Sequence, residues 1–269
     1  MAVTVYDHPL SPYGQKVKIA LNEKGVEYGA PLPTGIGSGS ADPEFAAGSP
    51  RGEVPLLLHE EAAIFDSSVI LAYIEEVWPN PALLPATARD RARVRMLEET
   101  MDTHYEAITW GLSEVRYFHR ASGAEAERFE AIAQEQLMRW HAWLAAQLAD
   151  RPWFNGDAFG WGDLCVLPFV NGAVGFGYGP DAPALTDWLA RANARDSVAP
   201  VVAAAAAVAF DSPAISLEAV HEAMAAGLFK RQYRDHRLEW MVRSGGLGVV
   251  ADGLAKDNIR LIEPFAAPG

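Results

Sequence analysis

The chain has 269 residues, of which 50% are hydrophobic and 21% are charged, so it is long enough to bury one or two apolar cores. Its net charge of -13 argues against general binding to nucleic acid or to an anionic membrane surface. No apolar stretch reaches the roughly 20 residues of a membrane-spanning helix, and no basic segment followed by an apolar one opens the sequence. We therefore expect a cytoplasmic enzyme with neither a membrane nor a nucleic-acid partner.

The single cysteine, Cys165, excludes an internal disulfide bond and any metal site built from several cysteines. It lies within the apolar run Leu164–Leu167, which predicts a small buried side chain and not a catalytic thiol. We expect no metal ion in this protein.

A serine follows the first predicted strand, at the start of a predicted helix. The strand is the apolar run Val3–Tyr6, and Ser11 precedes a helix that ends at Gly25 and has apolar residues at Val17, Ala20 and Leu21. The free N–H groups and the positive dipole at a helix start favour an anion, such as a thiolate. In the alternative interpretation, Ser11 only caps the helix.

Residues 1–78 alternate short apolar runs with helical segments, the pattern of a small α/β unit. Residues 29–49 are rich in Gly, Pro, Ser and Ala, which predicts a long surface loop beside the site. A Val54–Pro55 step then leads into an apolar run, and the pair Asp66–Ser67 begins a helix.

After a linker marked by Pro79 and Pro81, the sequence becomes helical. Apolar residues recur at steps of three and four over 94–115 and again over 129–148, which predicts two long helices. A later helix starts near Gly160, three residues before Asp163. Because a glycine occupies the capping position, we expect Asp163 to be structural and not catalytic.

Together, the serine after the first strand, the Val54–Pro55 step and the Asp66–Ser67 pair resemble the glutathione S-transferase family, and the similarity extends to about Phe210. The resemblance implies an α/β N-terminal thioredoxin-like domain over residues 1–80, with a cis peptide bond before Pro55. It implies an all-α domain over residues 87–211. It also implies glutathione as the co-substrate and a homodimer.

For the chemistry, the resemblance implies that a hydroxyl donates a hydrogen bond to the glutathione sulfur and favours the thiolate, which is the nucleophile. Ser11 is the first candidate, since the spacing Ser-x-x-Gly-Gln-x-Val resembles serine-using classes of the family. Tyr6 and Tyr13 are competing donors, because other classes use a tyrosine on or just after the first strand.

The tripeptide also needs anchors for its backbone and for its charged ends. The main chain of Val54 can pair with it, because the proline turn that follows leaves these groups outside the sheet ladder. Ser67, at a helix start, can bind the γ-glutamyl carboxylate, and Asp66 can receive the ammonium group. The other candidates are Arg51, for the glycine carboxylate, and Glu53, where the family often has a basic or amide residue.

The candidates for binding a flat, apolar electrophile are aromatic residues that the helical domain could place above the sulfur. The alternative for each is a place in the core, which is the commoner fate of aromatic residues at helical spacing. These candidates are Tyr13, Tyr105, Trp110, Tyr117 and Trp161.

Residues 212–269, which we call the C-terminal extension, continue past the ordinary end of the family. They predict a helix over 217–243 that packs on the all-α domain and is locally basic in an acidic chain. The extension is either a packed structural helix or a cover for the pocket or the subunit interface. Long extensions of this kind resemble those of bacterial β-etherases, which use glutathione to cleave aryl ethers of lignin-derived compounds.

The resulting hypothesis is a bacterial glutathione transferase whose bound thiolate attacks a small aromatic substrate. Glutathione-dependent cleavage of a β-aryl ether is the favoured reaction, and conjugation of halogenated or nitro aromatic compounds is the alternative. A further alternative is a non-catalytic protein that uses this fold to bind partners, and failure to bind glutathione would favour it.

Overall fold

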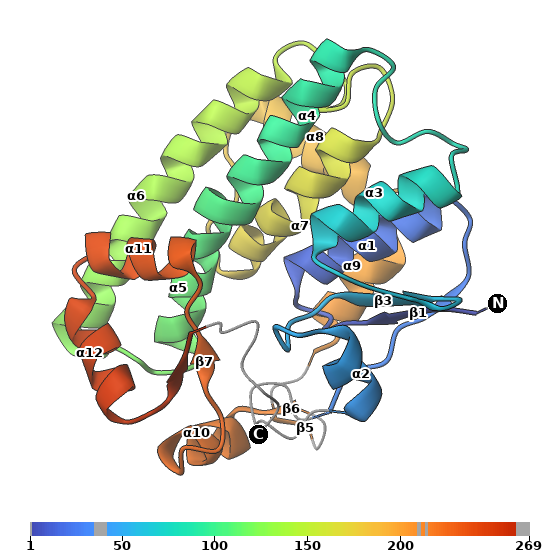
Figure 1. Ribbon diagram of the computed structural model, residues 1–269. Helices are drawn as coiled ribbons and strands as arrows, with labels where there is room; N and C mark the ends of the chain where they lie inside the picture. The colour runs from blue at the N-terminus through green and yellow to red at the C-terminus, as the bar shows by residue number, and fades with distance from the viewer. Residues whose placement is uncertain (1, 35–41, 209–210, 213–214, 262–269) are drawn as a thin grey trace.

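The computed structural model describes residues 2–34, 42–208, 211–212 and 215–261. The chain begins with an α/β part built on one mixed sheet (Figure 1). The strand order is β2-β1-β3-β4, in which β1 is parallel to β2 and the other pairs are antiparallel. In chain order, the elements are β1 (Val3–Tyr6), α1 (Pro12–Glu23), β2 (Tyr28–Gly29), α2 (Pro43–Gly48), β3 (Leu56–His59), β4 (Ala62–Phe65) and α3 (Ser67–Val77).

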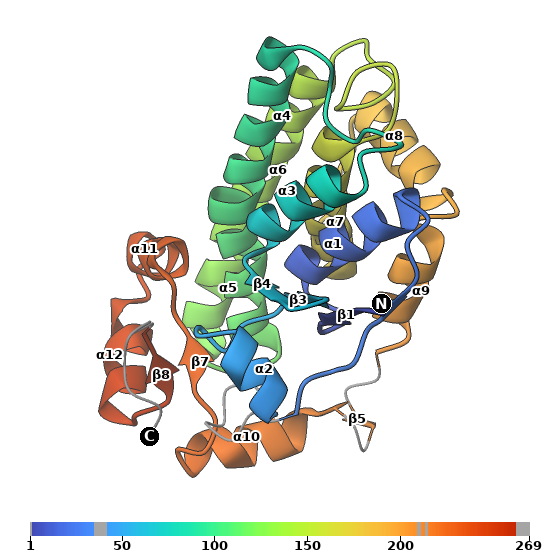
Figure 2. The ribbon, with the colours of Figure 1, turned by 45° about the vertical axis from the view of Figure 1, so that its right-hand side comes forward.

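The two faces of this sheet have different covers, with α1 and α3 on one side and α2 on the other (Figures 1 and 2). Val3 and Val5 of β1 join the main core, together with residues of α1 and α3. Tyr6 instead packs with Phe45 and Leu56 in a small cluster under α2. Since side chains alternate along a strand, Tyr6 lies on the opposite face of the sheet from α1.

A helical part follows, and its first helix contains a π-helical segment, η1. The elements α4, η1 and α5 follow one another without a break, and α6 runs back beside α5 (Figure 1). Helix α7 packs against both α1 and α4, so the main core is continuous between the two parts. The elements are α4 (Ala88–Thr100), η1 (Met101–Tyr105), α5 (Glu106–Arg116), α6 (Gly123–Leu148), α7 (Trp161–Gly175), α8 (Pro183–Asn193) and α9 (Ala199–Ala206).

The C-terminal extension packs on α5 and η1 through α11 (Figure 2). The single helix that the sequence predicts over 217–243 is wrong: two helices lie there, separated by a short strand. Gly227, with φ +71°, follows the end of the first helix, and β7 pairs with β8. The elements near and within the extension are β5 (Asp211–Ser212), β6 (Ile215–Ser216), α10 (Leu217–Ala225), β7 (Arg231–Gln232), α11 (Asp235–Arg243), α12 (Leu247–Ala255) and β8 (Ile259–Arg260).

Other local expectations have mixed outcomes. The cis peptide bond between Val54 and Pro55 is present, and Cys165 is buried. The long loop expected over residues 29–49 is wrong in part, because Asp42 caps α2 by accepting a hydrogen bond from the N–H of Glu44 at 3.0 Å. Residues 35–41 of that segment lie outside the described residues. No helix in the described ranges has the length and apolar character needed to cross a membrane.

The buried carboxylate of Asp163 fixes the start of α7, in a structural role. Its oxygens accept hydrogen bonds from the N–H of Gly160 at 3.1 Å and from the N–H of Phe154 and the indole of Trp188, both at 2.8 Å. A Cβ atom at position 160 would lie only 2.5 Å from the Leu83 carbonyl oxygen. This close approach explains why a glycine stands where a serine or threonine cap is usual.

Candidate functional site

Three strand ends meet in one row at an edge of the sheet. Tyr6 of β1 pairs with Leu56 of β3, and Leu56 pairs with Phe65 of β4. Strands β1 and β4 end at this row, and β3 begins there. The sheet register therefore brings to one edge the segments just beyond it, which contain Ser11, Val54–Pro55 and Asp66–Ser67.

Two helices begin at this edge, each with a side chain as its cap. The Ser11 hydroxyl accepts a hydrogen bond from the N–H of Gly14 at 3.2 Å, and the Asp66 carboxylate accepts one from the N–H of Ser68 at 3.2 Å. Asp66 has φ +72°, a conformation that costs a non-glycine residue on the order of 1 to 3 kcal/mol. The two helix dipoles and this strained turn are typical of an anion-binding site.

Of the three candidate hydroxyl donors, two already donate their hydrogen bonds to other groups of the chain. The Tyr6 hydroxyl donates to Glu44 at 2.6 Å, and this hydrogen bond together with burial raises the pKa of Tyr6 to about 12. The Tyr13 hydroxyl donates to the Asp102 carbonyl oxygen at 2.7 Å, and burial raises the pKa of Tyr13. Among the residues that the structure describes, none accepts the Ser11 proton, which leaves that proton available to a ligand.

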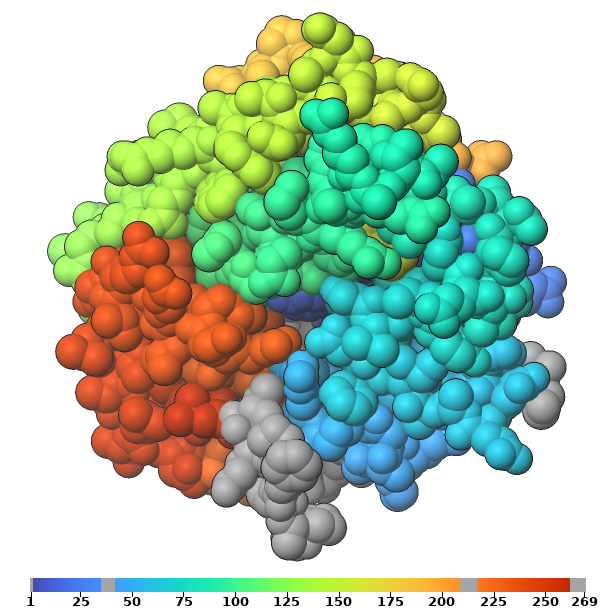
Figure 3. All heavy atoms as spheres, turned by 45° about the horizontal axis from the view of Figure 1, so that its top comes forward, coloured from blue at the N-terminus to red at the C-terminus, as the bar shows by residue number. Residues whose placement is uncertain are grey.

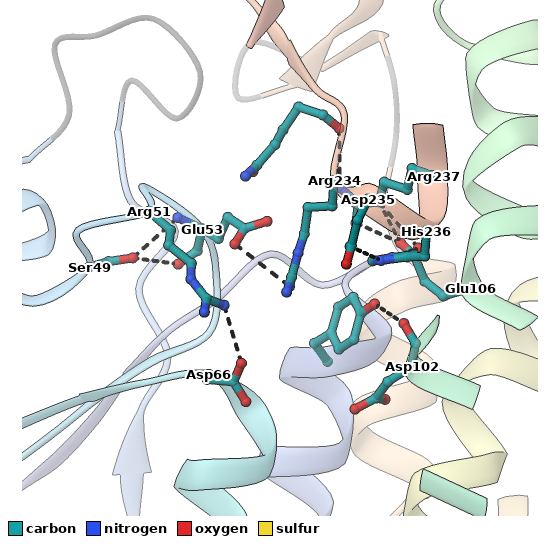
Figure 4. A network of polar contacts seen from close by, with 12 residues as sticks. Ser49, Arg51, Glu53, Asp66, Asp102, Glu106, Arg234, Asp235, His236 and Arg237 are labelled. Atoms are coloured by element: carbon teal, nitrogen blue, oxygen red, sulfur yellow. Dashed lines mark hydrogen bonds and ion pairs between the residues drawn. The ribbon is translucent and has the colours of Figure 1, made fainter. Parts of the chain in front are cut away.

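The loop before β3 is fixed by one buried side chain (Figure 4). The Ser49 hydroxyl donates to the Glu53 carbonyl oxygen at 2.9 Å and accepts from the Glu53 N–H at 3.2 Å. The next residue, Val54, makes no backbone hydrogen bond to any described residue, so its N–H and carbonyl are open to an extended peptide. Arg51 Nη1 lies 3.3 Å from Asp66 Oδ2, which joins this loop to the start of α3.

Beneath the site, a buried lysine ties α1 to the helical part. Lys16 Nζ lies 3.0 Å from Glu98 Oε1 and 2.6 Å from Asp102 Oδ2, and its side chain is fully buried. Ser68 of α3 donates to Glu98 at 2.7 Å. Burial opposes ionisation of Glu98, but Lys16, Ser68 and the Trp161 indole outweigh it and lower its pKa. This network holds both helix starts against α4 and η1.

The structure does not gather the five aromatic candidates around one surface. Tyr105 is fully buried and its hydroxyl is hydrogen bonded to His141 at 2.8 Å. Trp161 is 2% exposed, and its indole donates to Glu98 at 2.7 Å. Both side chains therefore lie in the buried core of this structure, which is the place that the core alternative predicts.

Two more of the aromatic candidates contact other parts of the chain. Trp110 is 7% exposed and meets the ring of Tyr233 edge-on at 4.7 Å, so the extension covers it. The ring of Tyr117 packs against Phe176 at 5.5 Å. Tyr13, in the first turn of α1, is the candidate nearest to Ser11 in the chain.

Buried ion pairs hold the extension against α5, and the sequence did not predict them. Arg237 Nη2 lies 2.6 Å from Glu106 Oε1, and Arg231 Nε lies 2.6 Å from Glu114 Oε1. Burial alone would raise the pKa of Glu106, but Arg237 and His236 outweigh it and lower the pKa to about 2. The signal in the sequence was a pair of glutamates eight residues apart, on one helix face, opposite an arginine-rich segment.

Figure 3 shows a hollow where the α/β part, the α5 region and the extension meet. In Figure 4, Glu53 of the α/β part and Arg234 of the extension face each other, and Arg51 points toward Asp66. The candidate site is therefore bounded by all three parts of the chain.

Comparison with known families agrees with this geometry. The model described as "Glutathione S-transferase, N-terminal domain" matches residues 5–82, and that described as "Glutathione S-transferase, C-terminal domain" matches residues 112–196. A maleylacetoacetate isomerase of Pseudomonas aeruginosa is 30% identical over 190 residues, which cover 66% of this chain and 84% of that protein. The chain belongs to the glutathione S-transferase family.

Other relatives and solved structures are consistent with this assignment. Glutathione S-transferase U28 of Arabidopsis thaliana is 27% identical over 208 residues, covering 73% of this chain and 87% of that protein. A glutathione S-transferase from Rhodospirillum rubrum has TM-score 0.66 and 28% identity, covering 74% of this chain and 91% of that one. A rice glutathione S-transferase whose structure was solved with glutathione has a TM-score of 0.63 and 25% identity, and the match covers 82% of this chain and 93% of that one. The extension lies outside both family models.

Proposed function

We propose that this protein is an active glutathione transferase in which Ser11 activates the thiol. Family membership makes glutathione its co-substrate. The observation that most supports a catalytic role is the hydroxyl proton of Ser11, which has no acceptor among the described residues and lies at the N-terminus of α1. Donated to the glutathione sulfur, this proton favours the thiolate, and the helix dipole acts in the same direction.

The binding mode follows from the row of groups at the sheet edge. The main chain of Val54 pairs with the peptide, and Pro55 places that residue outside the sheet. Ser67 receives the γ-glutamyl carboxylate and Asp66 the ammonium group. The 3.3 Å contact with Asp66 supports a role for Arg51 at this γ-glutamyl end, in place of the glycine carboxylate that the sequence alone suggests.

For the electrophile, we propose a β-aryl ether ketone. The thiolate attacks the carbon that bears the aryloxy group, a C–S bond forms, the C–O bond breaks and the electron pair leaves with the phenolate. The ketone beside the reacting carbon remains intact. The extension supports a specialised substrate, because it lies outside both family models and contacts the loop before Val54. An aryl halide or nitro aromatic is the competing electrophile, and turnover of both compounds with glutathione separates the two reactions.

The test of Ser11 is the alanine variant, Ser11→Ala. We expect a higher pKa of the bound thiol and a kcat lower by about tenfold to a thousandfold, or ~1.4 to 4 kcal/mol, while glutathione still binds. The measurement is the thiolate absorbance in the ultraviolet as a function of pH. Thr87→Ala is the matched control, since Thr87 caps α4 through the N–H of Asp90 in the same way. If the pKa of the bound thiol is unchanged in Ser11→Ala, the hydroxyl that activates the thiol is that of Tyr13 or Tyr6.

Two further proposals rest on the family and not on a contact in this chain. A homodimer is expected, and Val69 of α3 and Met96 of α4 are apolar residues exposed by 55% and 64%. A non-catalytic interaction protein is the alternative to an enzyme. It would be supported by a well-folded protein that fails to bind glutathione.

A further inference from the structure

The extension contacts the loop beside the proposed glutathione site at two points. Arg260 Nη1 donates a hydrogen bond to the Arg51 carbonyl oxygen at 2.7 Å. Arg234 Nη1 lies 3.9 Å from Glu53 Oε2. A segment that lies outside the family models therefore meets the α/β part next to Val54.

Arg234 differs from the arginines beside it in the extension. Arg231 and Arg237 make ion pairs of 2.6 Å with glutamates that are at most 6% exposed. The ion pair of Arg234 with Glu53 is longer, at 3.9 Å, and its side chains are 29% and 20% exposed. Arg234 donates no side-chain hydrogen bond to any described residue, although a guanidinium has five N–H donors. It is a partly exposed cation with donors to spare.

The position of Arg234 along the site follows from the sheet register. Leu56 pairs with Phe65, so the segment that leads into β3, with Glu53 and Val54, and Asp66, which follows β4, lie at the same end of the sheet. A peptide that binds Asp66 with its γ-glutamyl end and Val54 with its backbone passes next to Glu53, the residue before Val54, and we place its glycine end there. Figure 4 shows Arg234 facing Glu53 from the extension.

We propose that Arg234 binds the glycine carboxylate of glutathione, so that the extension supplies part of the co-substrate site. This inference rests on the proposed function. The planar fork of an arginine suits a carboxylate, and the charge of Arg234 offsets that of Glu53, which would otherwise repel the ligand. The two residues form a loose pair that the ligand carboxylate joins or replaces. Bound glutathione then links the loop to the extension.

The experiment compares glutathione with its glycine monoethyl ester, in which an uncharged ethyl ester replaces the glycine carboxylate. Calorimetry gives the Kd of each ligand for the wild type and for Arg234→Gln. We expect Arg234→Gln to weaken glutathione about tenfold, as a charged hydrogen bond implies, and to leave the ester unchanged. Arg243→Gln is the matched control, because Arg243 lies on α11 and its side chain is 77% exposed. It should change neither affinity.

Each other outcome counts against the proposal in a different way. If Arg234→Gln weakens both ligands equally, Arg234 acts on the site only through the fold. If it weakens neither, Arg234 does not contact glutathione. If the wild-type protein binds the ester but does not distinguish it from glutathione, the glycine carboxylate is not recognised, although the proposed function stands. If the wild type binds neither ligand, the proposed function itself is refuted together with this inference.

Discussion

The packing of the extension on α5 depends on Gly111. A Cβ atom at this position would lie 2.2 Å from Cζ3 of Trp240, whereas carbon atoms in contact are about 3.5 to 4 Å apart. Trp240 would have to move by about 1.5 Å to restore that separation. It cannot do so freely, because its indole donates to Gln136 at 2.8 Å and its ring packs against Phe129.

The size of the effect follows from two opposing contributions. Gly111→Ala overpacks the contact at a cost of about 1 to 3 kcal/mol. The same change favours the helix by up to about 1 kcal/mol. Gly248→Ala has only the second contribution, because Gly248 lies in α12 and a Cβ atom there has no neighbour within 4 Å, so the difference between the two variants isolates the first. We expect Gly111→Ala to be less stable than Gly248→Ala by about 1 to 3 kcal/mol.

Urea unfolding measures this difference, and amide hydrogen exchange shows where it acts. In Gly111→Ala, the amides of α11 should exchange faster than in the wild type, whereas those of α1 should be protected as before. The reasoning would be refuted by a Gly111→Ala protein that is as stable as Gly248→Ala and keeps wild-type protection in α11. That result would mean that Trp240 repacks at no cost.

Two further predictions concern Ser67, the proposed anchor of glutathione, and Glu106, whose ion pair holds the extension against α5. Ser67→Ala should weaken glutathione binding by roughly 1 to 3 kcal/mol with less effect on thiol chemistry, and equal affinities by calorimetry would place the γ-glutamyl end elsewhere. The pKa of Glu106 falls from its ordinary 4.5 to about 2, so this carboxylate adds stability above pH 4.5 that is lost as the pH falls toward 2. The loss is about 3 kcal/mol. Near-ultraviolet circular dichroism follows the acid unfolding of the wild type and of Glu106→Gln. The loss of stability between pH 4.5 and 2 should be smaller in Glu106→Gln, and identical acid-unfolding profiles of the two proteins would contradict this.

Whether the extension covers the site is best tested with substitutions in the full chain and not with a truncated chain. The extension covers Trp110 and supplies the cations for two buried carboxylates, those of Glu106 and Glu114. Deleting residues 212–269 would remove Arg231, His236 and Arg237, so Glu106 would lose its described cationic partners and Glu114 would keep only Arg120, at 3.6 Å. Losing these ion pairs and the apolar contacts of the extension is destabilising. A truncated protein would therefore report on stability before it reported on the electrophile site.

The sequence by itself determined the family, the order of the α/β and helical parts, and the local motifs of the site. These features are encoded over short distances: Ser11 after a strand, the step at Val54–Pro55, and an acidic cap before Ser67. Each follows from local rules for caps, turns and strand ends. The sequence left Ser11, Tyr6 and Tyr13 open as hydrogen-bond donors to the glutathione sulfur, because a side-chain partner far along the chain cannot be predicted from local spacing.

Only the tertiary structure decided how these hydroxyls are used and where the extension lies. Tyr6 faces α2 and bonds Glu44, whereas Tyr13 bonds the backbone of Asp102, 89 residues away in the chain. The same holds for the aromatic residues, since helical periodicity does not tell a core position such as Tyr105 from a pocket wall. Contacts between distant segments depend on which faces become buried together, and that is settled when the whole chain packs.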